Sequence, residues 1–238
     1  MVLTYQIWQA ITCGCLHDYT LTTADLKKIE TADMFIFNGM GIENFVIKIL
    51  STYPKILAIN ASQGIDDLIN NENEENAHIW LSLDKYINQV ENVKQGLIDY
   101  DSTHKDEYEK NGNDYITKLK ELKSMIEKAT IQEKNCLSFS ESLAYLQESM
   151  NLNMKILETD HEQNGLSAES IAEAIKYVKE NNIKNIIIDK QTALNNAQTV
   201  ANETEAKIYV LDAVLSGNEE ANYIKIMEEN LKIVESME

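Results

Sequence analysis

The sequence predicts an α/β protein with two lobes, each built on a mainly parallel sheet, and a long helix that joins them. From Asp25 onward, short apolar runs alternate with longer helical stretches, which is typical of βα units. The alternation stops between Leu83 and Lys128, where apolar residues recur at helical spacing, and it resumes in the rest of the chain. A chain of 238 residues is also long enough for two compact lobes.

The first lobe is expected to span residues 1–82. Its pattern predicts, in order, a helix at 25–32, a strand at 34–39, a helix at 42–53, a strand at 55–62 and an acidic, Asn-rich loop at 66–77. That loop has no apolar period, so it is interpreted as a solvated linker.

The linking helical region is expected at residues 83–130, with an interruption near 99–103. Asp101, Ser102 and Thr103 are all good helix-capping residues, so a second helix should start there. The second lobe, residues 131–238, resumes the alternation. It predicts strands at 135–139, 154–159, 185–190 and 207–214, and helices at 141–151, 167–182, 192–205 and 223–237.

The charge balance excludes several classes of partner. The formal net charge is -18, from 39 acidic and 21 basic residues, and every basic residue is lysine. The acidic surplus repels polyanions, and without arginine the chain lacks the guanidinium fork that reads bases and clamps phosphates. We therefore expect binding neither to nucleic acid nor to anionic membrane surfaces. A negative field suits a cation as ligand, although it equally serves solubility.

No apolar stretch approaches the length of a membrane span, and no signal peptide is visible at the start MVLTYQIWQAITCGC, which has no basic region. The sequence also contains no Gly-rich phosphate loop, nucleophile elbow or H-E-x-x-H helix. We therefore predict no catalytic residues and no organic cofactor site, and interpret the protein as a non-enzyme.

Histidines and strand-end carboxylates are the candidates for chemistry. His17 and His78 lie where loops meet regular structure, and Asp189 and Asp212 each end an apolar strand. A sheet fixes such a carboxylate, and two imidazoles with a carboxylate suit zinc or manganese. An alternative is a softer site in which Cys13 and Cys15 join His17, although it lacks the second ligand pair that structural zinc motifs have.

Several segments resemble, in one colinear order, the solute-binding proteins of ABC importers that take up zinc or manganese. CLHDYTLTTADLKKIETADMFIFNGMGIENF is similar to the segment around that family's first ligand histidine, and NAHIWLSLDKYINQVENV to the second. AKIYVLDAVLSG resembles the strand that carries its ligand aspartate, and NYIKIMEENLKIV its closing helix. The resemblance runs from about Gly14 to the C-terminus and implies two lobes bridged by a rigid helix, with a cation between them.

The resemblance also implies a ligand set. His17, His78 and Asp212 match three of the family's ligands, and the fourth position falls on Ser140. A hydroxyl binds zinc less well than imidazole does, so Glu141, His161 or water is expected to complete the shell. Only sixteen residues precede His17, so the first βα unit of the N-terminal lobe is expected to be truncated.

By this resemblance the protein is expected to bind zinc, or alternatively manganese, as a monomer, and to deliver it to an ABC permease in the membrane. The location expected is the periplasm or the surface of a bacterium, as a lipoprotein in full-length form. Two alternatives remain open: a metal-free paralogue that acts as an adhesin, and a metal-dependent hydrolase in which Glu141 is the general base.

Overall fold

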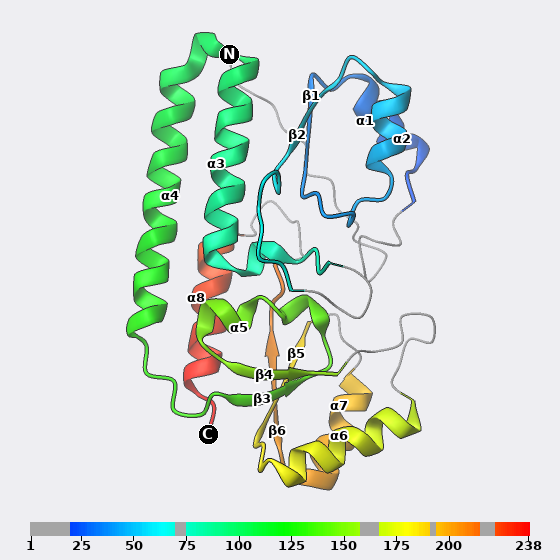
Figure 1. Cartoon of the computed structure of the whole chain (residues 1–238), viewed down its shortest axis with the longest axis vertical. Coiled ribbons are helices and arrows are strands. Elements are labelled where there is room, and N and C mark those ends of the chain that lie inside the picture. Colours follow the sequence, from blue (N-terminus) through cyan, green and yellow to red (C-terminus); the bar gives the residue numbers. More distant parts are fainter. Residues whose placement is uncertain (1–19, 70–74, 158–166, 191–193, 215–221) are drawn as a thin grey trace. The chain divides into compact units, whose positions relative to one another are not determined.

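The computed structural model describes residues 20–69, 75–157, 167–190, 194–214 and 222–238. It divides into two compact units, the first ending at Lys120 and the second beginning at Glu121. Both are α/β with parallel strands, as the sequence predicts (Figure 1). His17 and His161, together with Cys13 and Cys15, lie outside the described residues.

In the first unit, the described strands form a two-stranded parallel sheet of β1 (Met34–Phe37) and β2 (Leu57–Asn60). Phe37 pairs with Asn60 at the carboxyl end of this sheet. Helix α1 (Thr23–Glu30) precedes β1, and α2 (Val46–Thr52) connects the two strands. Helix α2 begins later than residue 42, where the sequence pattern predicts it, because residues 38–43 form a tight loop first.

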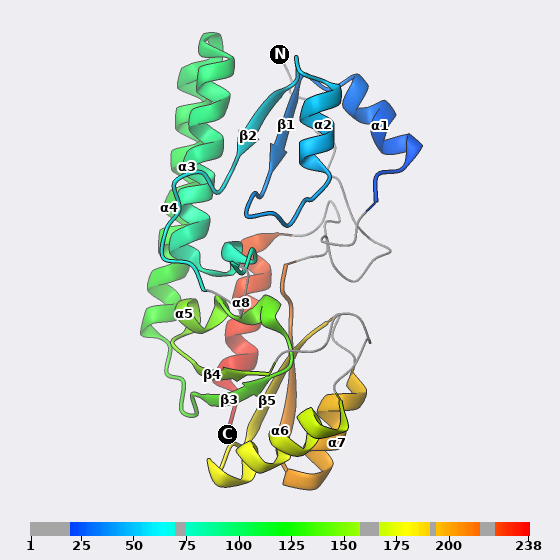
Figure 2. The ribbon, with the colours of Figure 1, turned by 45° about the vertical axis from the view of Figure 1, so that its right-hand side comes forward.

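Two long helices follow. Helix α3 spans Leu83–Tyr100 and α4 spans Lys105–Lys128, with the short 3-10 turn η3 (Ser102–His104) between them. The predicted interruption near 99–103 is therefore confirmed. The two helices run side by side, in green and blue-green (Figures 1 and 2). The boundary between the two units falls within α4.

The second unit contains a four-stranded parallel sheet in the order β4-β3-β5-β6. Its strands are β3 (Asn135–Ser138), β4 (Asn153–Ile156), β5 (Asn185–Asp189) and β6 (Lys207–Leu211). Every residue of β5 is buried. This is expected of an inner parallel strand covered on both faces, and it explains the unbroken apolar run that ends at Asp189.

Helices cover both faces of this second sheet. Helices α6 (Ala168–Glu180) and α7 (Leu194–Thr204) pack against Leu137, Ile186 and Ile188 to form a buried core. Helix α8 (Tyr223–Glu235) lies on the other side of the sheet (Figures 1 and 2). Among the described residues, no helix is long and apolar enough to cross a membrane.

The helix predicted at 141–151 is broken in the structure. Residues Glu141–Leu143 form a 3-10 turn, η4, and only Leu146–Met150 form an α-helix, α5. The side chain of Ser140 makes no capping hydrogen bond to this turn, although a serine at this position favours one. Its hydroxyl donates to the Asp189 carboxylate instead.

The thiol of Cys136 is expected to be almost unreactive in the native protein. Its side chain is buried in β3, and burial raises the pKa of the thiol to about 12, with the nearby charge of Glu133 adding to the effect. We expect a C13S/C15S variant, which keeps Cys136 as its single cysteine, to react with a disulfide reagent about 1,000-fold more slowly when folded than when denatured, because the thiolate is that much scarcer. Similar rates in the two states would contradict this assignment.

Candidate metal centre

In the first unit, a tight loop follows the carboxyl end of β1. The backbone N–H groups of Asn38 and Gly39 donate hydrogen bonds to the Glu43 carboxylate, at 2.7 and 3.1 Å. Burial raises the pKa of Glu43, although these two bonds favour its charged form. The carboxylate thereby fixes the loop conformation, in which Gly39 has a φ of +91°.

Asn38 connects this loop to the segment that carries His78. Its side-chain amide donates to the carbonyl oxygen of Ala77 at 3.0 Å, and its oxygen accepts a bond of 2.8 Å from Gln89 on α3. Gln89 and Ser62 are themselves buried, and Gln89 also donates to the Ser62 hydroxyl at 3.3 Å. The polar side chains at the end of the sheet therefore hold the backbone immediately before His78.

The imidazole of His78 is buried, and its protonation pattern follows from one neighbour. The side-chain oxygen of Asn76 accepts a hydrogen bond of 2.9 Å from the His78 backbone N–H and also lies 2.9 Å from His78 Nδ1. A carboxamide oxygen has no hydrogen to give, so neutral His78 carries its proton on Nδ1. Its Nε2 is then the nitrogen with a lone pair, which is the form that binds a metal ion.

In the second unit, three polar side chains meet where β3 and β5 end. Ser140 and Ser142 follow β3, and their hydroxyl oxygens lie 2.6 Å apart. Both hydroxyls donate to Oδ2 of Asp189, the last residue of β5, with 2.6 Å for the bond from Ser142. Ser140, Ser142 and Asp189 are all buried. The Ser140 hydroxyl is therefore part of a hydrogen-bonded cluster with Asp189.

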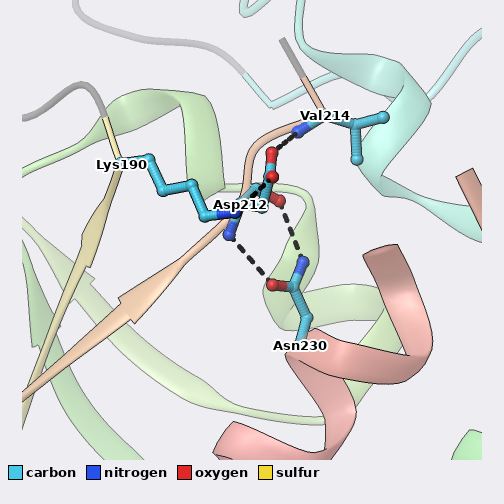
Figure 3. A network of polar contacts seen from close by, with 4 residues as sticks. All are labelled: Lys190, Asp212, Val214 and Asn230. Atoms are coloured by element: carbon cyan, nitrogen blue, oxygen red, sulfur yellow. Dashed lines mark hydrogen bonds and ion pairs between the residues drawn. The ribbon is translucent and has the colours of Figure 1, made fainter. Parts of the chain in front are cut away.

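Asp212 follows β6 at the same edge of this sheet and is held from three sides (Figure 3). Asn230 on α8 binds its backbone twice: the Asp212 N–H donates to the Asn230 oxygen, and the Asn230 amide donates to the Asp212 carbonyl, each at 2.9 Å. The Asp212 carboxylate is also held: Oδ1 accepts from the Val214 N–H at 2.8 Å, and Oδ2 contacts Lys190 Nζ at 2.8 Å. Position and orientation of the carboxylate are thus both fixed.

The structure places the predicted ligands on separate parts of the fold. His78 belongs to the first unit, whereas Ser140, Glu141 and Asp212 belong to the second. Glu141 is the first residue of η4 and is half-buried. Within the described part of the chain, no three His, Cys, Asp or Glu side chains are grouped so that they could hold a metal ion. The ligand set therefore remains a prediction.

Sequence reasoning missed three residues that shape these sites, namely Asn76, Lys190 and Asn230. Asn230 is a buried polar residue on the apolar face of α8, and this position is the one signal that could have identified it. Lys190 is revealed only by strand register, because Asp189 pairs with Leu211 and the next residues on both strands then become neighbours. Asn76 sits inside the acidic segment interpreted as a solvated linker, yet it is buried.

Comparisons with known proteins agree with this architecture. A relative from Bacillus subtilis named high-affinity zinc uptake system protein ZnuA is 28% identical, over 90% of this chain and 75% of its own length. The manganese ABC transporter substrate-binding lipoprotein PsaA of Streptococcus anginosus is 25% identical, over 93% of this chain and 78% of its own.

A solved structure shares the fold. The Zn(II)-bound ZnuA-like domain of Streptococcus pneumoniae AdcA has a TM-score of 0.77 and 28% identity, over 92% of this chain and 85% of that domain. The chain spans about half (48%) of the complete AdcA lipoprotein. The family model described as zinc-uptake complex component A, periplasmic, matches residues 13–237, which is nearly the whole chain. The chain therefore belongs to the family of zinc-uptake complex component A proteins.

Proposed function

We propose that this protein captures a divalent cation and delivers it to the permease of an ABC importer, without catalysing a reaction. His17, His78 and Asp212 are the ligands in this proposal, and the periplasm or the bacterial cell surface is its location. The names of the relatives support it, since they describe zinc uptake and a manganese substrate-binding lipoprotein. These relatives favour neither adhesion nor hydrolysis.

The observation that carries the proposal is the tautomer of His78. Asn76 Oδ1 accepts from both the backbone N–H and Nδ1 of this residue, so the imidazole is already in the form that ligates through Nε2. The ring is buried as well, which limits its hydration and so lowers the cost of replacing water by a metal ion.

Two imidazoles and a carboxylate favour zinc over manganese. Affinity for nitrogen ligands rises from manganese to zinc along the Irving–Williams series, whereas manganese gains more from additional oxygen ligands. The Ser140 hydroxyl is bound to Asp189, which supports leaving it out of the ligand set. Glu141, His161 or water then completes the coordination shell. If water completes it, one coordination position stays open to exchange, which suits a carrier.

Metal binding to the demetallated full chain tests the proposal. Zinc and manganese are added separately, and the dissociation constants are measured by competition with a chromophoric chelator. We expect a zinc complex that raises the melting temperature, because a ligand at 100 times its Kd stabilises the folded state by about 2.7 kcal/mol. The H17A/H78A variant and the D212A variant should each lose at least about 10-fold in affinity, which is the low end for disturbing a metal site.

His104→Ala is the matched control. His104 lies in η3 and contacts the Asp101 carboxylate at 2.6 Å, so its removal deletes one imidazole from the chain without touching the proposed ligands. The control should bind zinc as tightly as the unaltered chain. If neither metal binds, or if the H17A/H78A and D212A variants bind as tightly as the control does, the proposal is wrong.

A further inference from the structure

Lys190 and Asp212 lie side by side because of strand register. Asp189, the last residue of β5, pairs with Leu211, the last residue of β6, and the Lys190 N–H continues the ladder by donating to the Leu211 carbonyl at 3.1 Å. The next residues along both strands are therefore neighbours at the carboxyl edge of the sheet. Lys190 Nζ lies 2.8 Å from Asp212 Oδ2.

The two oxygens of the Asp212 carboxylate have different kinds of partner. Oδ1 accepts from the Val214 backbone N–H, which is part of the same turn two residues later in the chain. Oδ2 is bound by the ammonium of Lys190 (Figure 3). The Lys190 side chain is 61% exposed, whereas the Asp212 side chain is only 13% exposed. The first contact is built into the turn, but the second can be exchanged, because an exposed lysine leaves an ion pair at little cost.

We infer that Lys190 is a tethered competitor for the cation at Asp212, so that its ammonium and the metal ion exchange on Oδ2. The inference rests on the proposed function, in which Asp212 is a ligand. When the cation is absent, Lys190 neutralises the carboxylate. When the cation binds, the ammonium must leave Oδ2 and remains tethered nearby, where it repels a second positive charge.

This arrangement lowers affinity and eases release. A carrier has to give up its cation at the permease, and a built-in cation that returns to the ligand stabilises the emptied state. The contact between Val214 and Oδ1 is compatible with both states, so the carboxylate keeps its orientation while its partner changes. Lys190 thus sets how tightly the site holds its cargo, and it does so without touching the metal ion.

Charge variants at position 190 test this inference through the Kd for zinc and for manganese, measured on the demetallated full chain. Removal of the ammonium in Lys190→Gln should tighten binding by about 2- to 5-fold, the upper part of the range for an ion pair with one exposed partner. Lys190→Glu should tighten it further, because its carboxylate attracts the cation.

Lys184→Gln is the matched control. Lys184 is exposed and precedes β5, whereas Lys190 follows it. The substitution Lys184→Gln therefore changes the net charge by the same amount, but at the opposite end of the strand. Its affinity should equal that of the unaltered chain. Equal affinities for Lys190→Gln and the unaltered chain would overturn the inference alone, and so would an equal gain in Lys184→Gln, which would indicate a general field effect. If no form of the chain, including Lys190→Glu, binds either metal, the proposed function falls with it.

Discussion

Replacing Gly39 by alanine is expected to destabilise the first unit by about 2–4 kcal/mol. Gly39 has a φ of +91°, a conformation that costs an L-residue about 1–2 kcal/mol. An added Cβ would also collide with the side-chain oxygen of Asn60, which accepts a hydrogen bond of 3.0 Å from the Ser62 N–H. Moving Asn60 breaks that bond, which adds about 1–2 kcal/mol.

Gly41→Ala separates the two contributions. Gly41 lies in the same loop with a φ of +75°, but an added Cβ there meets no atom of the described chain within 4 Å. It should therefore cost only the backbone strain of about 1–2 kcal/mol. Urea unfolding followed by the fluorescence of Trp80, in a background in which Trp8 is replaced by phenylalanine, measures both variants, because Trp80 belongs to the first unit. Equal losses in the two variants would show that the contact with Asn60 is unimportant.

Replacing Asp189 by alanine is expected to destabilise the second unit by about 2–6 kcal/mol. The carboxylate accepts from two buried hydroxyls, those of Ser140 and Ser142, and without it both lose their acceptor. Each buried polar group left without its partner costs about 1–3 kcal/mol. Exposure of the Cys136 thiol in a C13S/C15S background reports unfolding of this unit, because Cys136 lies in β3.

Ser142→Ala and the double variant complete the cycle. Ser142→Ala removes one donor and leaves the bond between Ser140 and Asp189 in place, so it should cost about 1 kcal/mol. The double variant should lose less free energy of unfolding than the sum of the two single variants, because no Ser142 hydroxyl is left buried without an acceptor. Strict additivity would mean that Ser142 and Asp189 do not interact in solution.

The element order was predictable from the sequence because each strand and most helices have a local signal, such as an apolar run or a capping residue. Strand β5 is a run of isoleucines, and its full burial needs no alternation. Helix α6 begins where Ser167 caps it, with the Ser167 hydroxyl accepting from the Ser170 N–H at 3.0 Å. Where the local preference of a segment agrees with its packing in the fold, the sequence pattern alone predicts the element.

The site was less predictable, because its geometry depends on contacts between residues far apart in sequence. The start of the helix after β3 fails as a prediction because the Ser140 hydroxyl binds Asp189, 49 residues later, in preference to the helix backbone. Asp212 was identifiable as a strand-end carboxylate, but the lysine that faces it depends on the register of β5 against β6. No short motif encodes either contact.

The pair of hydrogen bonds between the Asn230 side chain and the Asp212 backbone separates what determines the stability of the fold from what would determine cation affinity. The Asn230 amide closes this contact when α8 packs against the sheet, so the ordering of Asp212 belongs to folding and is complete before any cation arrives. Lys190, by contrast, has an exposed side chain that contributes little to folding, and in the proposed exchange it acts only when the cation binds or leaves. If Asp212 is a ligand as proposed, stability and affinity are set at this residue by different neighbours, and sequence changes at position 190 are then expected to change how tightly the cation is held while the fold stays the same.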